Sequence, residues 1–260
     1  MTQSGETADT LAAMEYASQQ GSSQIVVLEQ EGSQATRIAD FALPIHAGQE
    51  IGVASTKTMI ASMTTLLEVS IFLARVRSAI DADRVKQLVE QISTLPSLLA
   101  STLDRNGETS DVAKHLAKFT DLLYLGRGLQ FPIALEGALK MKELAYIHAE
   151  GYPAGEMKHG PLALIEEGLP VVILAPKDRY FEKTISNMQE VIARGAKVLL
   201  ITNKSKDEVY SENIWEKIEV ENTSEDLLPF LITIPLQKLA YYSALKRGYD
   251  IDKPRNLAKS

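Results

Sequence analysis

The hydrophobic residues of this chain alternate between a helical spacing and short, wholly apolar runs. Apolar residues recur at helical spacing over residues 8–20, stop at Gly21, and are followed by the apolar run 24–28. This order predicts a helix, a glycine stop and a buried strand. A weaker strand is expected over 41–45, and a long helix over 55–80.

The second half of the chain repeats this alternation after a polar, turn-rich stretch at 106–111, where we place a domain boundary. The expected domains are therefore 1–108 and 109–260. The helix before the boundary, over 83–104, is expected to be kinked or interrupted near Pro96. The remaining helices are expected over 129–150, 180–194 and 227–247, and the remaining strands over 121–128, 171–176, 197–202 and 215–220.

The two halves also resemble each other. The segments that start at Thr10 and at Thr184 each carry a helix, a glycine stop and a buried strand, followed by a weaker strand and a long apolar helix. This internal repeat favours an α/β fold with two copies of one unit, each a parallel sheet flanked by helices. The first copy is expected to lack its opening strand and helix. Met1 would then lie at the end of a buried strand, which suits a truncated gene or an internally chosen start.

Composition narrows the function classes. The chain of 260 residues has no cysteine, which excludes disulfides, a thiolate zinc site and a cysteine nucleophile. Its 34 acidic and 27 basic side chains give a net charge of −7, which argues against a nucleic-acid-binding surface but allows a local anion site. No apolar run approaches the roughly 20 residues that cross a bilayer, and the first residues lack a basic opening. The sequence therefore predicts a soluble cytoplasmic protein with no membrane or nucleic-acid partner.

A cluster of hydroxyl side chains and one glycine stands before the first helix, over residues 2–10. Hydroxyls and backbone N–H groups can converge there on an anion at the positive end of the helix, and phosphate is the expected anion. The alternative is an ordinary helix cap in which Ser4 or Thr7 satisfies the helix alone. Composition does not decide between the two.

A charged stripe is expected on the helix over 129–150. Glu136, Lys140 and Glu143 fall at i, i+4 and i+7 in a segment rich in alanine, leucine and methionine. One interpretation is a solvated helix face. The apolar surroundings and the following loop, dense in glycine, proline, histidine and glutamate, favour a catalytic group instead.

Histidine supplies a further candidate. His159 could act as a general acid or base because the imidazole pKa lies near neutrality, although a lone histidine is more often structural. His148 and His159 with Glu150 and Glu156 match no zinc spacing, so no metal site is expected.

The whole chain carries motifs that match a known family. They are SGETADT, EIGVASTKT, LGRG, ALEGALKMKELAYIHAEGYPAGEMKHGPLALI, PLQKLAYYSALKRGYDID and KPRNLAKS. On these residues the chain resembles the sugar isomerase (SIS) half of the glutamine-dependent fructose-6-phosphate aminotransferases, the glucosamine-6-phosphate synthases. The resemblance implies two SIS-type subdomains in a homodimer that binds a sugar phosphate, with no metal or organic cofactor.

The resemblance also implies roles for individual residues. Glu143 matches the general base that moves a proton between C1 and C2 of the sugar, and Lys140 would stabilise the enolate-like intermediate. His159 matches a residue that assists ring opening from the neighbouring subunit. Lys259 matches the lysine that forms a Schiff base with the open-chain ketose, with Ala258 beside it. The residues implied to contact the substrate are Thr2, Gln3, Ser4 and Thr7 at its phosphate and Val53 and Ser55 at the sugar.

The complete family enzyme begins with a glutaminase domain whose N-terminal cysteine releases ammonia, and this sequence contains neither. A separate glutaminase or another ammonia source is therefore an expected partner. Three interpretations remain. The chain is an isomerase domain acting on fructose 6-phosphate, or a related module that binds a hexose phosphate or removes a sugar from an amine as a deglycase, or a fragment whose open sheet edges prevent folding.

Overall fold

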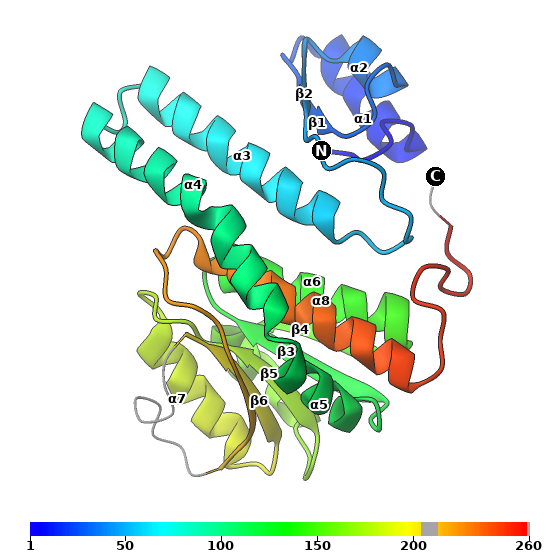
Figure 1. Ribbon diagram of the computed structural model, residues 1–260, viewed down its shortest axis with the longest axis vertical. Helices are drawn as coiled ribbons and strands as arrows, with labels where there is room; N and C mark the ends of the chain where they lie inside the picture. Colours follow the sequence, from blue (N-terminus) through cyan, green and yellow to red (C-terminus); the bar gives the residue numbers. More distant parts are fainter. Residues whose placement is uncertain (204–212, 259–260) are drawn as a thin grey trace. The chain divides into compact units, whose positions relative to one another are not determined.

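The computed structural model describes residues 1–203 and 213–258, and it divides the chain into two compact units (Figure 1). The first unit contains Met1–Ile92 together with Arg255–Ser260, and the second contains Ser93–Pro254. This division lies inside a helix, upstream of residue 108. The boundary between the two sequence repeats therefore stays a prediction.

The first unit holds a two-stranded parallel sheet. Strand β1 (Ile25–Leu28) pairs with β2 (Phe41–Pro44), with Ile25 opposite Phe41 and Leu28 opposite Pro44. A small core forms where Leu11, Val26, Leu28 and Ala35 pack together. The helices of this unit are α1 (Ala8–Gln19), α2 (Gln34–Ile38), α3 (Lys57–Val76) and the beginning of α4 (Ala82–Asp104).

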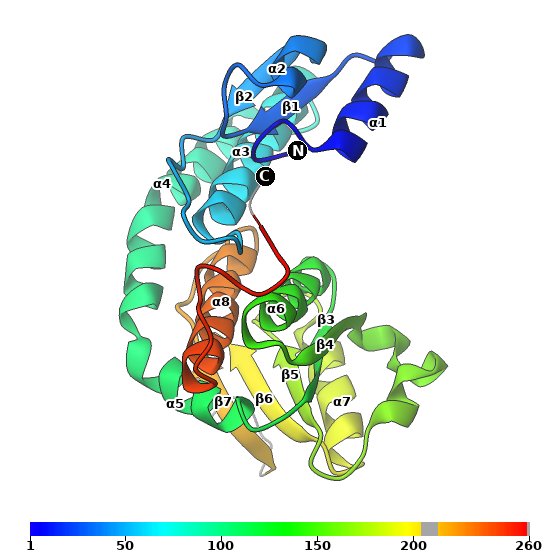
Figure 2. The same cartoon turned by 90° about the vertical axis from the view of Figure 1, so that its right-hand side faces the viewer.

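The second unit is built on five parallel strands in the order β4-β3-β5-β6-β7. Helices α5, α6 and α8 lie on one face of this sheet and α7 on the other (Figure 2). Strands β5 and β6 are apolar because both faces are covered, and their core is filled by residues such as Val171, Ile173 and Leu200. The strands are β3 (Asp121–Gly126), β4 (His148–Pro153), β5 (Pro170–Leu174), β6 (Lys197–Thr202) and β7 (Ile214–Glu219). The helices are α5 (Asn106–Leu116), α6 (Gln130–Ala145), α7 (Phe181–Ile192) and α8 (Leu228–Lys246), with 3₁₀ turns η1 (Ala154–His159) and η2 (Pro161–Leu164).

The α/β fold with parallel sheets flanked by helices is confirmed, but two local predictions are wrong. The stretch 106–111 opens α5 and is no turn, because Val112, Ala113 and Leu116 of that helix are buried and packing overrides local propensity. Pro96 lies inside α4 and does not interrupt it, and the alternative of a kink there stays a prediction. Helix α6 ends at Ala145 rather than at residue 150.

The early end of α6 has a local cause. Tyr146 takes a left-handed backbone conformation, with φ 52°, and directs the chain into β4. This strand was not predicted because it lies at the sheet edge, pairs only with β3 and carries the polar residues His148 and Glu150. The five-residue helix α2 was also not predicted.

The internal repeat can be compared with hydrogen bonds at the strands β1 and β6. The repeat aligns Val27 with Ile201. The carbonyl of each residue accepts a hydrogen bond from a backbone N–H of the segment beside its strand. Thr2 donates to Val27 at 3.0 Å, and Ala175, which follows β5, donates to Ile201 at 3.0 Å. The donors are one residue out of step, since the repeat aligns Ala175 with Met1 and Thr2 with Pro176. The first residues of the chain therefore run along β1 much as the end of β5 runs along β6, but in a shifted register.

Helix α3 is more apolar than the sequence prediction allowed. It spans 20 residues with a mean hydropathy of 1.6 over its most apolar window, which is long and apolar enough to cross a membrane by length and composition. Glu68 and Arg75 lie within it. One such helix among the described residues is weak evidence for a membrane span.

Candidate active site

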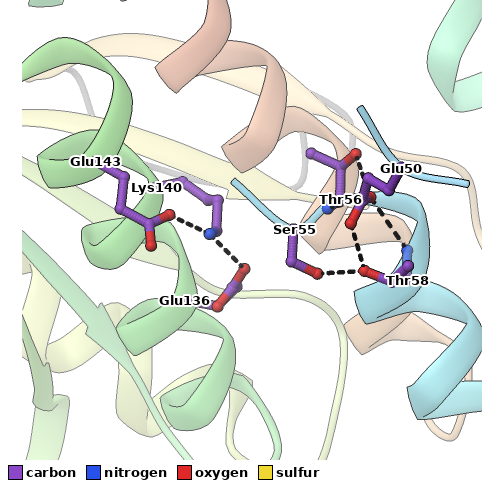
Figure 3. Close-up of polar contacts among 7 residues, drawn as sticks. All are labelled: Glu50, Ser55, Thr56, Thr58, Glu136, Lys140 and Glu143. Carbon is purple, nitrogen blue, oxygen red and sulfur yellow. Dashed lines mark hydrogen bonds and ion pairs between the residues drawn. The ribbon is translucent and has the colours of Figure 1, made fainter. Parts of the chain in front are cut away.

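Helix α6 carries the charged stripe in the second unit. Alanine, leucine and methionine occupy most of its positions, and Pro132 is tolerated because it stands in the first turn. Lys140 is 2% exposed and its Nζ donates a hydrogen bond to Glu143 Oε2. The same Nζ lies 3.7 Å from Glu136 Oε1. Figure 3 shows both carboxylates directed toward the lysine.

Burial of this stripe excludes a solvated helix face. Desolvation raises the pKa of Glu136 above its usual 4.5, although the nearby Lys140 cation opposes the shift. A buried ammonium is stable only when anions neutralise it, which the two carboxylates do. The arrangement places a carboxylate base next to a fixed positive charge, as proton abstraction beside a carbonyl requires.

His159 and His148 are not part of this cluster. His159 ends η1, its side chain is 76% exposed, and its Nε2 lies 4.0 Å from Glu156 Oε2. His148 on β4 lies 2.9 Å from Asp121 Oδ1 through its Nδ1. The described residues contain no group of three or more histidine and acidic side chains that could hold a metal ion.

The hydroxyl loop of the first unit, residues 2–7, lies beside a pocket. Gln3 and Ser4 line this pocket of about 560 Å³ together with Glu6, Glu29, Gln30, Gly48, Gln49 and Glu50. Thr2 Oγ1 accepts a hydrogen bond from the N–H of Gly5 at 3.3 Å, and Ser4 Oγ accepts one from the N–H of Glu6 at 3.2 Å. Thr7 is the N-cap residue of α1, but its side chain makes no capping hydrogen bond. The ordinary cap interpretation therefore does not describe Thr7.

Gly5 allows this loop to approach the sheet. Its φ of +70° is rarely adopted by other residues, and a Cβ there would lie 2.1 Å from Ser33 Oγ. The carboxylates that line this pocket accept hydrogen bonds from backbone N–H groups. Glu29 accepts from the N–H groups of Ala47 and Gly48, both at 2.8 Å. The acidic lining therefore holds loops in place.

The predicted sugar-pocket residues Val53 and Ser55 precede α3. Both are half-buried, and Ser55 Oγ lies 2.6 Å from Thr58 Oγ1. Thr58 also bonds to Glu50, a residue that the sequence reasoning did not single out. The EIGVASTKT motif contains Glu50, but a glutamate six residues before a helix cap is too common to signal a function.

The predicted residues fall into separate groups. Lys140 and Glu143 are in contact on α6, and Gln3 and Ser4 share a pocket of the first unit. Ala258 is exposed and belongs to the first unit. Lys259 lies outside the described residues, so its predicted role rests on the sequence.

Comparison with known proteins places these features in a family. The SIS domain model matches residues 1–70 and 115–247, which include most of α3. A glutamine–fructose-6-phosphate aminotransferase [isomerizing] of Brucella melitensis is 48% identical over 260 residues, and one of Aquifex aeolicus is also 48% identical. The chain spans only 43% of the length of the Brucella protein.

A solved structure agrees with both matches. The C-terminal domain of glucosamine-fructose-6-phosphate aminotransferase from Francisella tularensis superposes with a TM-score of 0.94 at 37% identity, covering 97% of this chain and 71% of that one. Helix α3 is therefore a helix of this domain and no membrane span. The chain belongs to the SIS domain family and matches the isomerase domain of glutamine–fructose-6-phosphate aminotransferases over its whole length.

Proposed function

We propose that the chain is the ketose/aldose isomerase part of a glucosamine-6-phosphate synthase. Its substrate is fructose 6-phosphate. With ammonia the products are glucosamine 6-phosphate and water, and without ammonia the product is glucose 6-phosphate. The observation that carries the proposal is the buried Lys140 held between Glu136 and Glu143 in a chain that matches aminotransferase isomerase domains throughout.

The chemistry follows from this stripe. The Glu143 carboxylate takes a proton from C1 of the open-chain ketose and delivers it to C2. The hydroxyl proton moves from O1 to O2 at the same time, so that C1 becomes the aldehyde and C2 carries the hydroxyl. Negative charge develops on the sugar oxygen between the two steps, and the Lys140 ammonium stabilises it. Because Lys140 is already fixed by two carboxylates, little reorganisation is needed when the charge appears.

Other groups complete the proposal. Thr2, Gln3, Ser4 and Thr7 bind the phosphate, and Val53 and Ser55 line the sugar pocket. Lys259 forms a Schiff base at C2 beside Ala258, and His159 assists ring opening in the neighbouring subunit of a homodimer. The exposed position of His159 is compatible with contact to a second copy. The ammonia reaches the site from outside this isomerase domain, and the protein works in the cytoplasm.

Turnover of fructose 6-phosphate tests this proposal. The purified chain is incubated with fructose 6-phosphate, with and without ammonium, and the products are separated by chromatography. Glu143→Gln is expected to abolish product formation because an amide cannot take the C1 proton. Glu182→Gln, which changes an exposed glutamate on α7, is the matched control and should keep wild-type turnover.

The outcomes separate the alternatives. Binding of fructose 6-phosphate without turnover by the intact protein would favour a hexose-phosphate-binding module. Release of an amine from a fructosyl-amine 6-phosphate without isomerisation would favour a deglycase. Full activity in a strictly monomeric preparation would refute the role of His159 across subunits.

A further inference from the structure

Glu50 organises the residues that lead into α3. It lies six residues before Thr56, the N-cap residue of that helix, whose own side chain makes no capping bond. Instead Glu50 Oε1 accepts hydrogen bonds from the backbone N–H of Thr56 at 2.9 Å and of Thr58 at 3.4 Å. A carboxylate at the positive end of a 20-residue helix is also favoured by the helix dipole.

The hydroxyl groups around Glu50 form a directed chain. Thr58 Oγ1 donates to Glu50 Oε2 at 2.6 Å, and Thr56 Oγ1 donates to Oε1 at 3.2 Å. An ionised carboxylate has no proton of its own and only accepts hydrogen bonds. The single hydroxyl proton of Thr58 is therefore committed to Glu50.

This commitment sets the direction of the next hydrogen bond. Ser55 Oγ and Thr58 Oγ1 lie 2.6 Å apart, and either hydroxyl could donate by distance alone. Because the Thr58 proton already points to Glu50, the Ser55 hydroxyl must donate to Thr58. Figure 3 shows the three side chains in this order, with Thr58 between Ser55 and Glu50. The Ser55 oxygen keeps lone pairs but has no proton left for a ligand.

We propose that Glu50 and Thr58 are positioning residues that make Ser55 an obligatory hydrogen-bond acceptor, so that this site selects a sugar hydroxyl that donates to it. The proposal rests on the proposed function, because that function places Ser55 at the sugar. It adds a rule of specificity. A substrate atom that can only accept a hydrogen bond is rejected at Ser55, because two acceptors face each other there.

The rule is tested with analogues of fructose 6-phosphate in which one hydroxyl at a time is replaced by fluorine. Fluorine can accept a hydrogen bond but cannot donate one. Affinities are measured by isothermal titration calorimetry. For the wild-type protein, the position that faces Ser55 is expected to lose about tenfold in affinity when fluorinated. Thr58→Val keeps the size of this 3%-exposed side chain but frees the Ser55 proton. The loss at that position should then shrink to within about twofold.

Thr56→Val is the matched control. It also removes one hydroxyl donor from Glu50, but Thr56 donates to Oε1 whereas the bonds that orient Ser55 run from Oε2 through Thr58, so the tenfold loss should remain. Glu50→Gln tests whether Glu50 sets the direction of these hydrogen bonds. The glutamine amide can donate to Thr58, which would reverse both the bond to Thr58 and the bond between Thr58 and Ser55. This variant should also tolerate fluorine. Amide hydrogen exchange at Thr56 and Thr58 reports whether each variant keeps the start of α3 folded.

The results distinguish this inference from the proposed function. Equal fluorine profiles in the wild type, Thr58→Val and Glu50→Gln would overturn the inference even if turnover is normal. The expected profiles without turnover would uphold it and refute the isomerase activity. Failure of the wild type to bind fructose 6-phosphate at all would refute both.

Discussion

The two units carry different chemical groups at loop positions that the internal repeat aligns. In the first unit, Ser4 Oγ accepts a hydrogen bond from the N–H two residues later, that of Glu6. The repeat aligns Ser4 with Asp178, whose Oδ1 accepts the equivalent bond from Tyr180 at 2.8 Å. The same turn is therefore closed by a neutral hydroxyl in one unit and by a carboxyl group in the other. Under the proposed function the first loop holds the phosphate, because Ser4 adds no negative charge at this position.

The long helices that follow the weaker strand of each repeat differ as well. Helix α3 has three buried residues, whereas its counterpart α8 has fourteen. In the second unit α8 packs between α5 and α6, and α6 brings the buried charges of Glu136, Lys140 and Glu143. The comparison shows a neutral hydroxyl at the aligned loop position of the first unit, beside the pocket carboxylates Glu6, Glu29 and Glu50, and a buried cluster of paired charges on α6 in the second.

Removing the buried cation should have the largest effect. Lys140→Met leaves two carboxylates partly buried without their counter-charge, and we expect a loss of about 3 kcal/mol in the free energy of unfolding at neutral pH. Urea unfolding followed by circular dichroism measures it. The control Lys183→Met changes an exposed lysine on α7 and should stay within about 0.5 kcal/mol of the wild type. Equal stability of the two variants would contradict the structural role given to Lys140.

Exchanging the loop residues between the units tests the comparison directly. Ser4→Asp places the second-unit residue in the first loop, and two like charges about 4 Å apart at a protein surface repel by about 4 kcal/mol. Fructose 6-phosphate should therefore bind at least about a hundredfold more weakly in a calorimetric titration.

The reciprocal variant is the control for that exchange. Asp178→Ser introduces the hydroxyl into the second loop and should leave the affinity for fructose 6-phosphate unchanged. If Asp178→Ser weakened binding as much as Ser4→Asp, the assignment of the phosphate to the first loop would be wrong.

The smallest expected effect concerns pH. Burial raises the pKa of Glu136 above its ordinary value of 4.5. The folded state therefore binds this proton more tightly than the unfolded state does. The contribution of Glu136 to the free energy of unfolding is greatest below pH 4.5 and decreases as the pH rises through the raised folded-state pKa.

Glu136→Gln removes this titration, so the stability of the wild type relative to the variant should decline as the pH rises through that window. Urea unfolding at a series of pH values from about 4 to 7 measures the difference. A difference that is constant with pH would show that Glu136 has no raised pKa.

The sequence predicted those features that depend on local pattern. A short, wholly apolar run such as that of Lys197–Thr202 is typical of a buried strand. The spacing of Glu136, Lys140 and Glu143 placed these three residues on one helix face. Burial of Lys140 was not predictable, because spacing alone does not distinguish a solvated stripe from one covered by neighbouring helices.

Other features depend on contacts between distant parts of the chain. Strand β4 has polar side chains and exists because β3 lies beside it. Helix α5 forms from a turn-like sequence because α8 covers its buried residues. The bonds from Glu50 to Thr56 and Thr58 depend on the path of the intervening loop, which the residue spacing does not determine.

The most direct test of the isomerase assignment is proton exchange at the substrate itself. Fructose 6-phosphate is incubated with the protein in D₂O, and its C1 protons and the C2 proton of any glucose 6-phosphate formed are followed by NMR. The account predicts that the wild type exchanges a C1 proton for deuterium and forms glucose 6-phosphate, and that Glu143→Gln does neither. Binding of fructose 6-phosphate by the wild type with no exchange at C1 and no glucose 6-phosphate formed would contradict it.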